Sequence, residues 1–280
     1  DGDMILRVIG SGVNGGDEYI YLTSYGVENW RYNPFQGKAL GLPNLDSKVN
    51  IYFQEDSLNY NSQTGKYEAA KDSVLKSIDR TSEERWDTYH GGAIGGGMNI
   101  HEDAYIFVGY YDPSTGRTTK LVNYGADFGF KIWTFDDFSP MGYSGVTDGY
   151  IYIWHIDGTG YYDKIVSVFY SNMDINWELE RGLALPDLPF TTQILYGSLP
   201  GEKEMLFSFY EEGAAYPSKL QKYKLPEAGF IWEFTRPQNI QFYTQSLGSD
   251  VFFIADFPEG NNEPLRTLAI YNTDASTKWT

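Results

Sequence analysis

Short apolar runs recur along the chain, and turn-forming residues bound each of them. The first run of each pair is MILRVIG, VNIYF, AYIFVGYY, GYIYIWHID, EMLFSFYEE or VFFIADF, and a second run follows it and leads to a tryptophan. Runs this short, rich in β-branched and aromatic residues, are typical of strands. Even the most helix-like stretch, AAKDSVLKSIDRTSEERW, occupies a strand position in this pattern. The pattern predicts an all-β chain.

Six of the seven tryptophans mark a repeat. They are Trp30, Trp86, Trp133, Trp177, Trp232 and Trp279, spaced by 56, 47, 44, 55 and 47 residues. Repeats of about 40 to 50 residues are typical of propeller blades. Each repeat offers a small-residue run (a), an apolar run (b), a run before a turn (c) and a segment that starts at the tryptophan (d). Radial repetition of such sheets makes a propeller, so we predict a six-bladed β-propeller of four-stranded antiparallel blades, one domain over residues 1–280.

The first repeat has no a strand of its own. That strand could come from residues before Asp1, or the ring could close with a thinner blade. Because the chain begins with DGDM, we expect a leader or an N-terminal domain to precede it. We therefore expect an exported bacterial protein, located in the periplasm or at the cell surface.

The composition of the chain excludes some classes of function and favours others. A net charge of −17 disfavours a broad nucleic-acid interface, because such a chain repels phosphates. No apolar run approaches 18 residues, so we expect no membrane span. The absence of cysteine excludes disulfides and thiolate chemistry. Aromatic residues make up 17% of the chain, with 24 Tyr, and tyrosine suits wet binding surfaces. We expect carbohydrate as the partner, with other cell-surface proteins as a further option.

The turn between c and d resembles the Asp-box of the sialidase (neuraminidase) family, whose pattern is roughly Ser-x-Asp-x-Gly-x-x-Trp. The matching residues are Ser171, Asp174 and Trp177; Asp127, Gly129 and Trp133; and Asp274 and Trp279. An aspartate can tie down a tight turn through backbone N–H groups, and the tryptophan can fill the gap between sheets. The resemblance implies a structural box on the face away from the active site.

The same resemblance implies an exo-acting glycoside hydrolase as one candidate activity. That chemistry uses an arginine triad for the substrate carboxylate, a tyrosine nucleophile helped by a glutamate, and an aspartate acid/base. The early Arg-Ile-Pro motif of the family is absent from this chain. Whether the protein is an enzyme stays open.

Ligands are expected on the face that the d–a and b–c connections share, since loops carry function on a rigid scaffold. The fourth residue after each tryptophan varies there, as Pro34, His90, Asp137, Arg181 and Arg236. Arginines can bind a carboxylate and tyrosines can stack on a sugar. Ordinary loop variation, solvated charges and edge packing explain the same residues equally well. The candidate ligand-binding residues are Arg31, Tyr32, Tyr89, His90, Asp136, Asp137, Arg181, Arg236, Tyr111, Tyr161 and Tyr162.

The sequence gives little support for a catalytic carboxylate pair, a nucleotide-binding motif or a metal site. Asp136 and Asp137 form a carboxylate pair, but neighbours on a strand point in different directions. The stretch HGGAIGGGMNIHED, residues 90–103, matches neither a dinucleotide fingerprint nor a P-loop. Its glycines are expected to let backbones approach closely along an inner strand. His101 is expected in the a–b turn on the face opposite His90, so we expect no shared metal and no cofactor.

Three functions remain. The first is an exported protein that binds or presents glycans on its loop face. The alternative is an exo-acting, sialidase-like glycoside hydrolase. The third is a protein–protein interaction scaffold.

Overall fold

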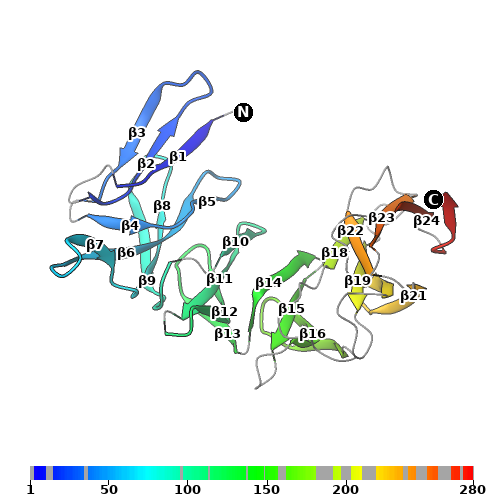
Figure 1. Ribbon diagram of the computed structural model, residues 1–280. Coiled ribbons are helices and arrows are strands. Elements are labelled where there is room, and N and C mark those ends of the chain that lie inside the picture. The colour runs from blue at the N-terminus through cyan, green and yellow to red at the C-terminus, as the bar shows by residue number, and fades with distance from the viewer. Residues whose placement is uncertain are drawn as a thin grey trace. The chain divides into compact units, whose positions relative to one another are not determined.

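The computed structural model covers the whole chain, and most of it is described below (Figure 1). The described residues are 3–10, 15–34, 37–94, 97–112, 114–136, 138–147, 149–156, 162–180, 192–196, 203–209, 219–235, 239–243, 251–257, 266–271 and 274–279. The chain divides into two compact units, Asp1–Pro140 and Met141–Thr280, which are treated separately.

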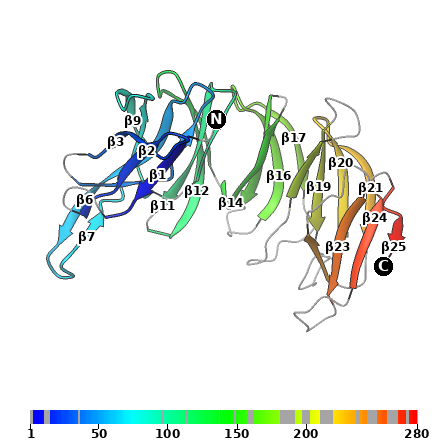
Figure 2. The same cartoon turned by 90° about the horizontal axis from the view of Figure 1, so that it is seen from above.

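The first unit contains three sheets (Figure 2). A three-stranded sheet has the order β1 (Met4–Val8), β2 (Glu18–Leu22), β3 (Glu28–Tyr32). The second sheet has the path β4 (Lys38–Leu40), β6 (Ile51–Asn61), β8 (Val74–Ile78), β9 (Glu84–Tyr89). The third has the order β10 (Met98–His101), β11 (Tyr105–Asp112), β12 (Arg117–Gly125), β13 (Lys131–Asp136).

The second unit contains three four-stranded sheets, and the first strand of these begins just before the boundary. One sheet has β14 (Phe138–Thr147), β15 (Tyr150–Ile156), β16 (Tyr162–Phe169) and β17 (Ile175–Glu180). The next has β18 (Thr192–Tyr196), β19 (Lys203–Phe209), β20 (Lys219–Leu225) and β21 (Gly229–Thr235). The last has β22 (Asn239–Tyr243), β23 (Val251–Phe257), β24 (Arg266–Tyr271) and β25 (Thr277–Trp279).

The predicted a–b–c–d strand order is confirmed, with four differences. The first sheet has three strands. This is the thinner blade that we had kept as an option because the first repeat lacks an a strand. The d strands begin two or three residues before their tryptophans, as Glu28 and Lys131 show for Trp30 and Trp133. β10 is also displaced from its small-residue run, since Gly91 and Gly92 precede it, whereas β14 contains its own run at residues 141–147 as expected. His101 ends β10 and does not lie beyond it.

The fourth difference is a ribbon in the second sheet. β6 is 11 residues long, and its second half pairs with β7 (Lys66–Ala69) instead of β8. β5 (Asn44–Leu45) also pairs with β6 only. Both views show the β6–β7 ribbon projecting from its sheet (Figures 1 and 2). Tyr60 and Tyr67 are cross-strand partners on this ribbon.

A β-bulge accompanies every tryptophan of the repeat. In each c–d pair, the tryptophan faces a c residue that directly precedes a shift in register, as in Trp86 opposite Ser77 and Trp133 opposite Asn123. The same arrangement holds in the other four pairs. A bulge increases local twist and re-aims side chains. The c–d turn and its tryptophan are therefore one recurring structural unit.

Three of the tryptophans connect neighbouring sheets. The indole Nε1 of Trp30 donates to the backbone oxygen of Arg80 at 2.6 Å, and that of Trp86 donates to Ala126 at 2.9 Å. In the second unit, Trp177 Nε1 donates to Pro226 at 2.5 Å. Each acceptor lies in or beside the c–d turn of the following sheet, so these bonds join consecutive sheets at the turn end.

The Asp-box residues form different contacts from turn to turn. Asp274 Oδ1 accepts from the backbone N–H of Ser276 at 2.9 Å. Asp174 instead accepts from the side chain of Asn172, and Asp127 lies 3.9 Å from Arg85. Asp79, which the Asp-box pattern had not selected, accepts from the N–H groups of its own turn. Gly129 adopts a φ of +69° in the turn before Trp133, and Ser171 lies in the turn before Trp177.

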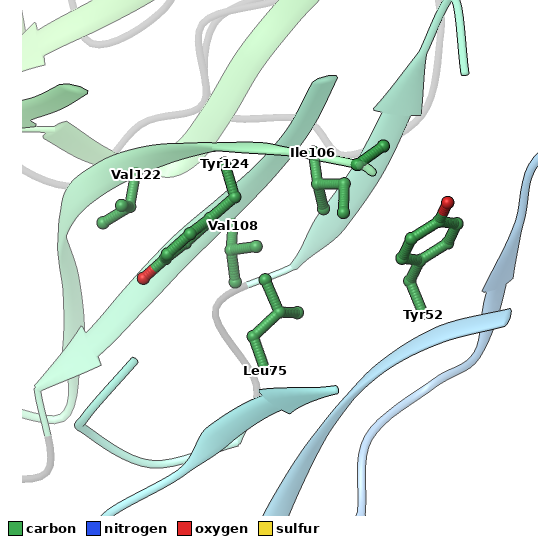
Figure 3. Close-up of a cluster of buried hydrophobic side chains, with 7 residues drawn as sticks. Tyr52, Leu75, Ile106, Val108, Val122 and Tyr124 are labelled. Atoms are coloured by element: carbon green, nitrogen blue, oxygen red, sulfur yellow. The ribbon is translucent and has the colours of Figure 1, made fainter. Parts of the chain in front are cut away.

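The core of the first unit lies between successive sheets. Between the second and third sheets, aliphatic and aromatic side chains pack against one another (Figure 3). The labelled members are Tyr52, Leu75, Ile106, Val108, Val122 and Tyr124. Leu75 and Val108 are fully buried, and burying one such side chain contributes about 1.5 to 3 kcal/mol. This packing positions the pocket described next.

Candidate functional site

A pocket of about 670 Å³ lies in the first unit, along the third sheet and the end of β9. This volume is within the range of about 300 to 1,000 Å³ that small-molecule sites occupy. The lining residues are Thr88, Tyr89, His90, Tyr110, Asp112, Thr119, Lys120, Val122, Tyr124, Lys131 and Thr134. Most come from the end of β9, the end of β11 and the start of β12, where the d–a and b–c connections lie.

His90 and Tyr124 form the buried part of the lining. The side chain of His90 is 7% exposed, and its Nδ1 lies 2.9 Å from the Tyr124 hydroxyl. Burial lowers the pKa of His90 to about 4, and the backbone of Gly109 offsets this effect only in part. Burial also raises the pKa of Tyr124 above its usual value. At neutral pH this part of the pocket is therefore uncharged, with an imidazole and a phenol sharing one hydrogen bond.

The backbone contacts after His90 explain why glycine follows it at Gly91 and Gly92. The N–H groups of His90 and Gly91 donate to the Ser73 oxygen at 3.1 and 2.8 Å, and the Ser73 N–H donates to Gly92. Gly92 has a φ of +68°, and a Cβ there would lie 2.6 Å from the Tyr111 oxygen. Only glycine fits this close approach. The expectation of close backbone contact thus holds at Gly92, which lies in the connection before β10.

Tyr89 forms the rim of the pocket. Its side chain is 70% exposed, and its hydroxyl donates to Asp72 Oδ1 at 2.7 Å. This hydrogen bond raises the pKa of the Tyr89 phenol. The bond fixes the ring orientation while leaving much of the ring open to solvent. An aromatic face held in this way can contact a ligand at little entropic cost.

Among the described residues, the charged side chains of the lining are two lysines and one aspartate. Lys120 Nζ lies 3.0 Å from Asp136 Oδ1, with both side chains substantially exposed. Asp112 Oδ1 accepts from the N–H and the hydroxyl of Ser114, and these bonds lower its pKa. Lys131 has no ion pair with any residue that the structure describes. Its ammonium group is available to a ligand.

The structure brings some of the sequence-predicted residues together and separates others. Tyr89 and His90 line the pocket, and Asp136 contacts it through Lys120. Tyr111 lies on β11, where its neighbour Tyr110 lines the pocket instead. Successive strand residues point to opposite faces, so this pocket takes Tyr110, and a binding role for Tyr111 stays a prediction.

Arg31 and Tyr32 lie on β3, away from this lining. Arg31 contacts Glu18 at 2.7 Å and Glu28 at 3.0 Å, and the Tyr32 hydroxyl donates to Glu55 at 2.7 Å. Arg31 is thus already paired with two carboxylates. Asp137, Tyr161, Arg181 and Arg236 lie outside the described residues, and Tyr162 is known only as the first residue of β16.

Sequence reasoning missed the other nine described residues of the lining, which are Thr88, Tyr110, Asp112, Thr119, Lys120, Val122, Tyr124, Lys131 and Thr134. The signal that could have found them is strand alternation, since Lys120, Val122 and Tyr124 occupy alternate positions of β12. Among the described residues no group of three or more His, Cys, Asp or Glu side chains could hold a metal ion. The same residues contain no helix that is long and apolar enough to cross a membrane.

Comparisons with known proteins identify the class of fold. No protein-family model matches the chain, and no curated protein matches it in sequence. Solved structures do match, and they are β-propellers, which confirms the predicted fold class. The sheets are those of a β-propeller, with the blade number resting on the sequence repeat.

Three examples, each with a TM-score of 0.50, illustrate the likeness. BamB from Moraxella catarrhalis is 11% identical, and the match covers 99% of this chain and 77% of that one. Quinohemoprotein alcohol dehydrogenase from Comamonas testosteroni is 12% identical, with 99% and 57% covered. A chain of the mitotic checkpoint complex is 6% identical, with 98% and 73% covered. At these identities the likeness concerns the fold alone.

Proposed function

We propose that this protein is a glycan-binding β-propeller and that the pocket of the first unit holds the sugar. The observation that carries the proposal is the composition of the lining. Three tyrosines and Val122 supply apolar surface, while three threonines, Asp112 and two lysines supply hydrogen-bonding groups. Sugars present both an apolar C–H face and a rim of hydroxyls. A site with few charges and several hydroxyls and aromatic rings matches that chemistry.

Binding is favoured over hydrolysis by the same lining. A sialidase-like enzyme uses a tyrosine nucleophile helped by a glutamate, with an aspartate as acid/base, whereas the described lining supplies one carboxylate, Asp112. That carboxylate is engaged by Ser114. The described lining contains two lysines and no arginine, whereas a sialidase-like enzyme binds the substrate carboxylate with arginines. We therefore place the exo-acting glycoside hydrolase second.

A glycan array combined with a fluorogenic sialoside panel tests the proposal. We expect array hits that Tyr110→Ala weakens and Tyr25→Ala leaves unchanged. Tyr25 is 91% exposed in the β2–β3 turn and lies outside the lining, so it is a matched control. We expect no turnover of the sialosides. Hits that are insensitive to Tyr110→Ala would refute this pocket, and sialoside turnover would favour the hydrolase.

The scaffold function has an observation of its own. Large apolar side chains are exposed in the c–d turns of the first unit, with Tyr25 at 91%, Phe128 at 76% and Val27 at 62%. Exposed apolar groups gathered on one part of a surface mark protein-binding sites. Phe128→Ser would abolish binding of a protein partner while leaving the sugar pocket intact. A partner complex that survives Phe128→Ser would count against this second function.

A further inference from the structure

The pocket is less acidic than the chain as a whole. The protein carries a net charge of −17, whereas the described lining has two lysines and one aspartate, with Asp136 paired to Lys120 beside it. His90 adds no charge near neutral pH, since burial holds its pKa at about 4. A cationic group in an acidic protein attracts anions to its own position, while the acidic remainder of the chain repels them.

The two lysines occupy separate positions along the sheet. Lys120 faces Tyr110 across β11 and Asp136 across β13. Lys131 faces Tyr124 across the β12–β13 pair. Because the four-residue step from Lys120 to Tyr124 along β12 spans about 13 Å, one ammonium group lies near each end of the lining. An apolar floor that includes Val122 and the Tyr124 ring separates them.

The two ammonium groups are not equivalent. Lys120 is already paired with Asp136, while Lys131 has no ion pair among the described residues. An exposed lysine that is already paired gains little from a second anion. Lys131 is therefore the group with the larger unused attraction for a negative charge.

We infer that the pocket selects a carboxylated sugar of the uronic acid class, with Lys131 contacting the carboxylate. This inference rests on the proposed glycan function and deepens it. The hydroxyls of Thr88, Thr119 and Thr134 then hydrogen-bond the sugar hydroxyls, and the Tyr110 ring packs against the C–H face of the sugar. Lysine binds anions as a compact point charge, so the carboxylate is held without the forked geometry that arginine imposes.

Neutral and acidic forms of the same sugar test this inference. Calorimetric or ligand-observed NMR titrations in 20 mM salt compare methyl glucoside with methyl glucuronide, and the galactose pair likewise. We expect the acidic member to bind about two- to fivefold more tightly, the gain typical of one exposed ionic contact. The preference should shrink in 300 mM salt, because screening weakens exposed ion pairs.

Two variants assign the effect to the pocket. Lys131→Gln should remove the preference for the acidic over the neutral sugar. The control Lys66→Gln, on the exposed β6–β7 ribbon, should keep the preference. Circular dichroism and thermal unfolding check that each variant is folded.

Each other outcome has a defined meaning. Equal binding of acidic and neutral sugars would overturn this inference and leave the glycan function standing. If neither the acidic nor the neutral sugar binds, both this inference and the proposed glycan function are overturned. Displacement of the uronide by inorganic phosphate at equal concentration would overturn the sugar class and leave a simple anion site. A preference that survives Lys131→Gln would remove Lys131 from its role.

Discussion

The burial of His90 predicts a specific acid sensitivity. Its pKa is about 4 in the folded protein, against about 6.5 in an unfolded chain, because the buried imidazole loses hydration when charged. A lowered folded pKa means that the unfolded state binds the proton first as the pH falls. The contribution of His90 to stability is therefore complete above about pH 6.5 and is lost between about pH 6.5 and pH 4.

The size of this effect follows from the two pKa values. The full difference of about 2.5 units corresponds to about 3 kcal/mol. Between pH 7.5 and pH 5.0 the loss amounts to about 2 kcal/mol, since at pH 5.0 the unfolded imidazole is almost fully protonated and the folded one is not. A loss of this size is large against the total stability of an ordinary domain.

The assay compares the wild-type chain with His90→Gln. Glutamine carries no titratable group and can still hydrogen-bond the Tyr124 hydroxyl, so every other group titrates alike in the two proteins. Urea unfolding followed by tryptophan fluorescence at pH 7.5 and pH 5.0 gives the free energy of unfolding of each. We expect the wild type to lose about 2 kcal/mol more than the variant over this interval. Equal losses would refute the burial argument.

Three further changes test the packing around the site, each by urea unfolding. Gly92→Ala should destabilise the protein by at least about 2 kcal/mol more than Gly97→Ala. A Cβ on Gly92 would lie 2.6 Å from the Tyr111 oxygen, while a Cβ on Gly97 would have no neighbour within 4 Å. Equal losses of stability would exclude the steric cause. Trp86→Phe should cost about 1 to 2 kcal/mol, because the Ala126 oxygen loses its indole donor at 2.9 Å; no loss would show that this bond contributes nothing. Leu75→Ala should cost about 2 to 5 kcal/mol through the cavity it leaves in the core, whereas Leu42→Ala, at a site 74% exposed, should change little.

The repeat made the fold predictable. Each tryptophan recurs at blade spacing, and the strands around it alternate or run apolar as the sheets require, so strand order followed from pattern alone. The ribbon of β6 and β7 was not predictable in this way, because it belongs to one repeat only. Strand ends were also missed, since a bulge beside the tryptophan shifts the pairing by one residue.

The site was predictable in part for a related reason. Tyr89 and His90 follow a tryptophan, so the repeat places them at the d–a end. Tyr110 and Lys120 lie within strands, and choosing them over Tyr111 required the strand register to be known. The pairing of Arg31 with Glu18 and Glu28 was hidden as well, because Glu18 is on a different strand. Contacts across strands carry no local signature in the sequence.

The two ends of the sheets differ for a physical reason that bears on function. At the c–d end, a bulge and an indole hydrogen bond recur, as Trp30, Trp86 and Trp177 show, and fix consecutive sheets to one another. A change there would disturb the contact between neighbouring sheets. In the first unit, the other end carries a ribbon in one sheet and the short Asp112–Ser114 turn in the next. That end can vary without loss of the core, and for this reason we place most of the ligand-binding residues there, while Lys131 lies nearer the c–d end.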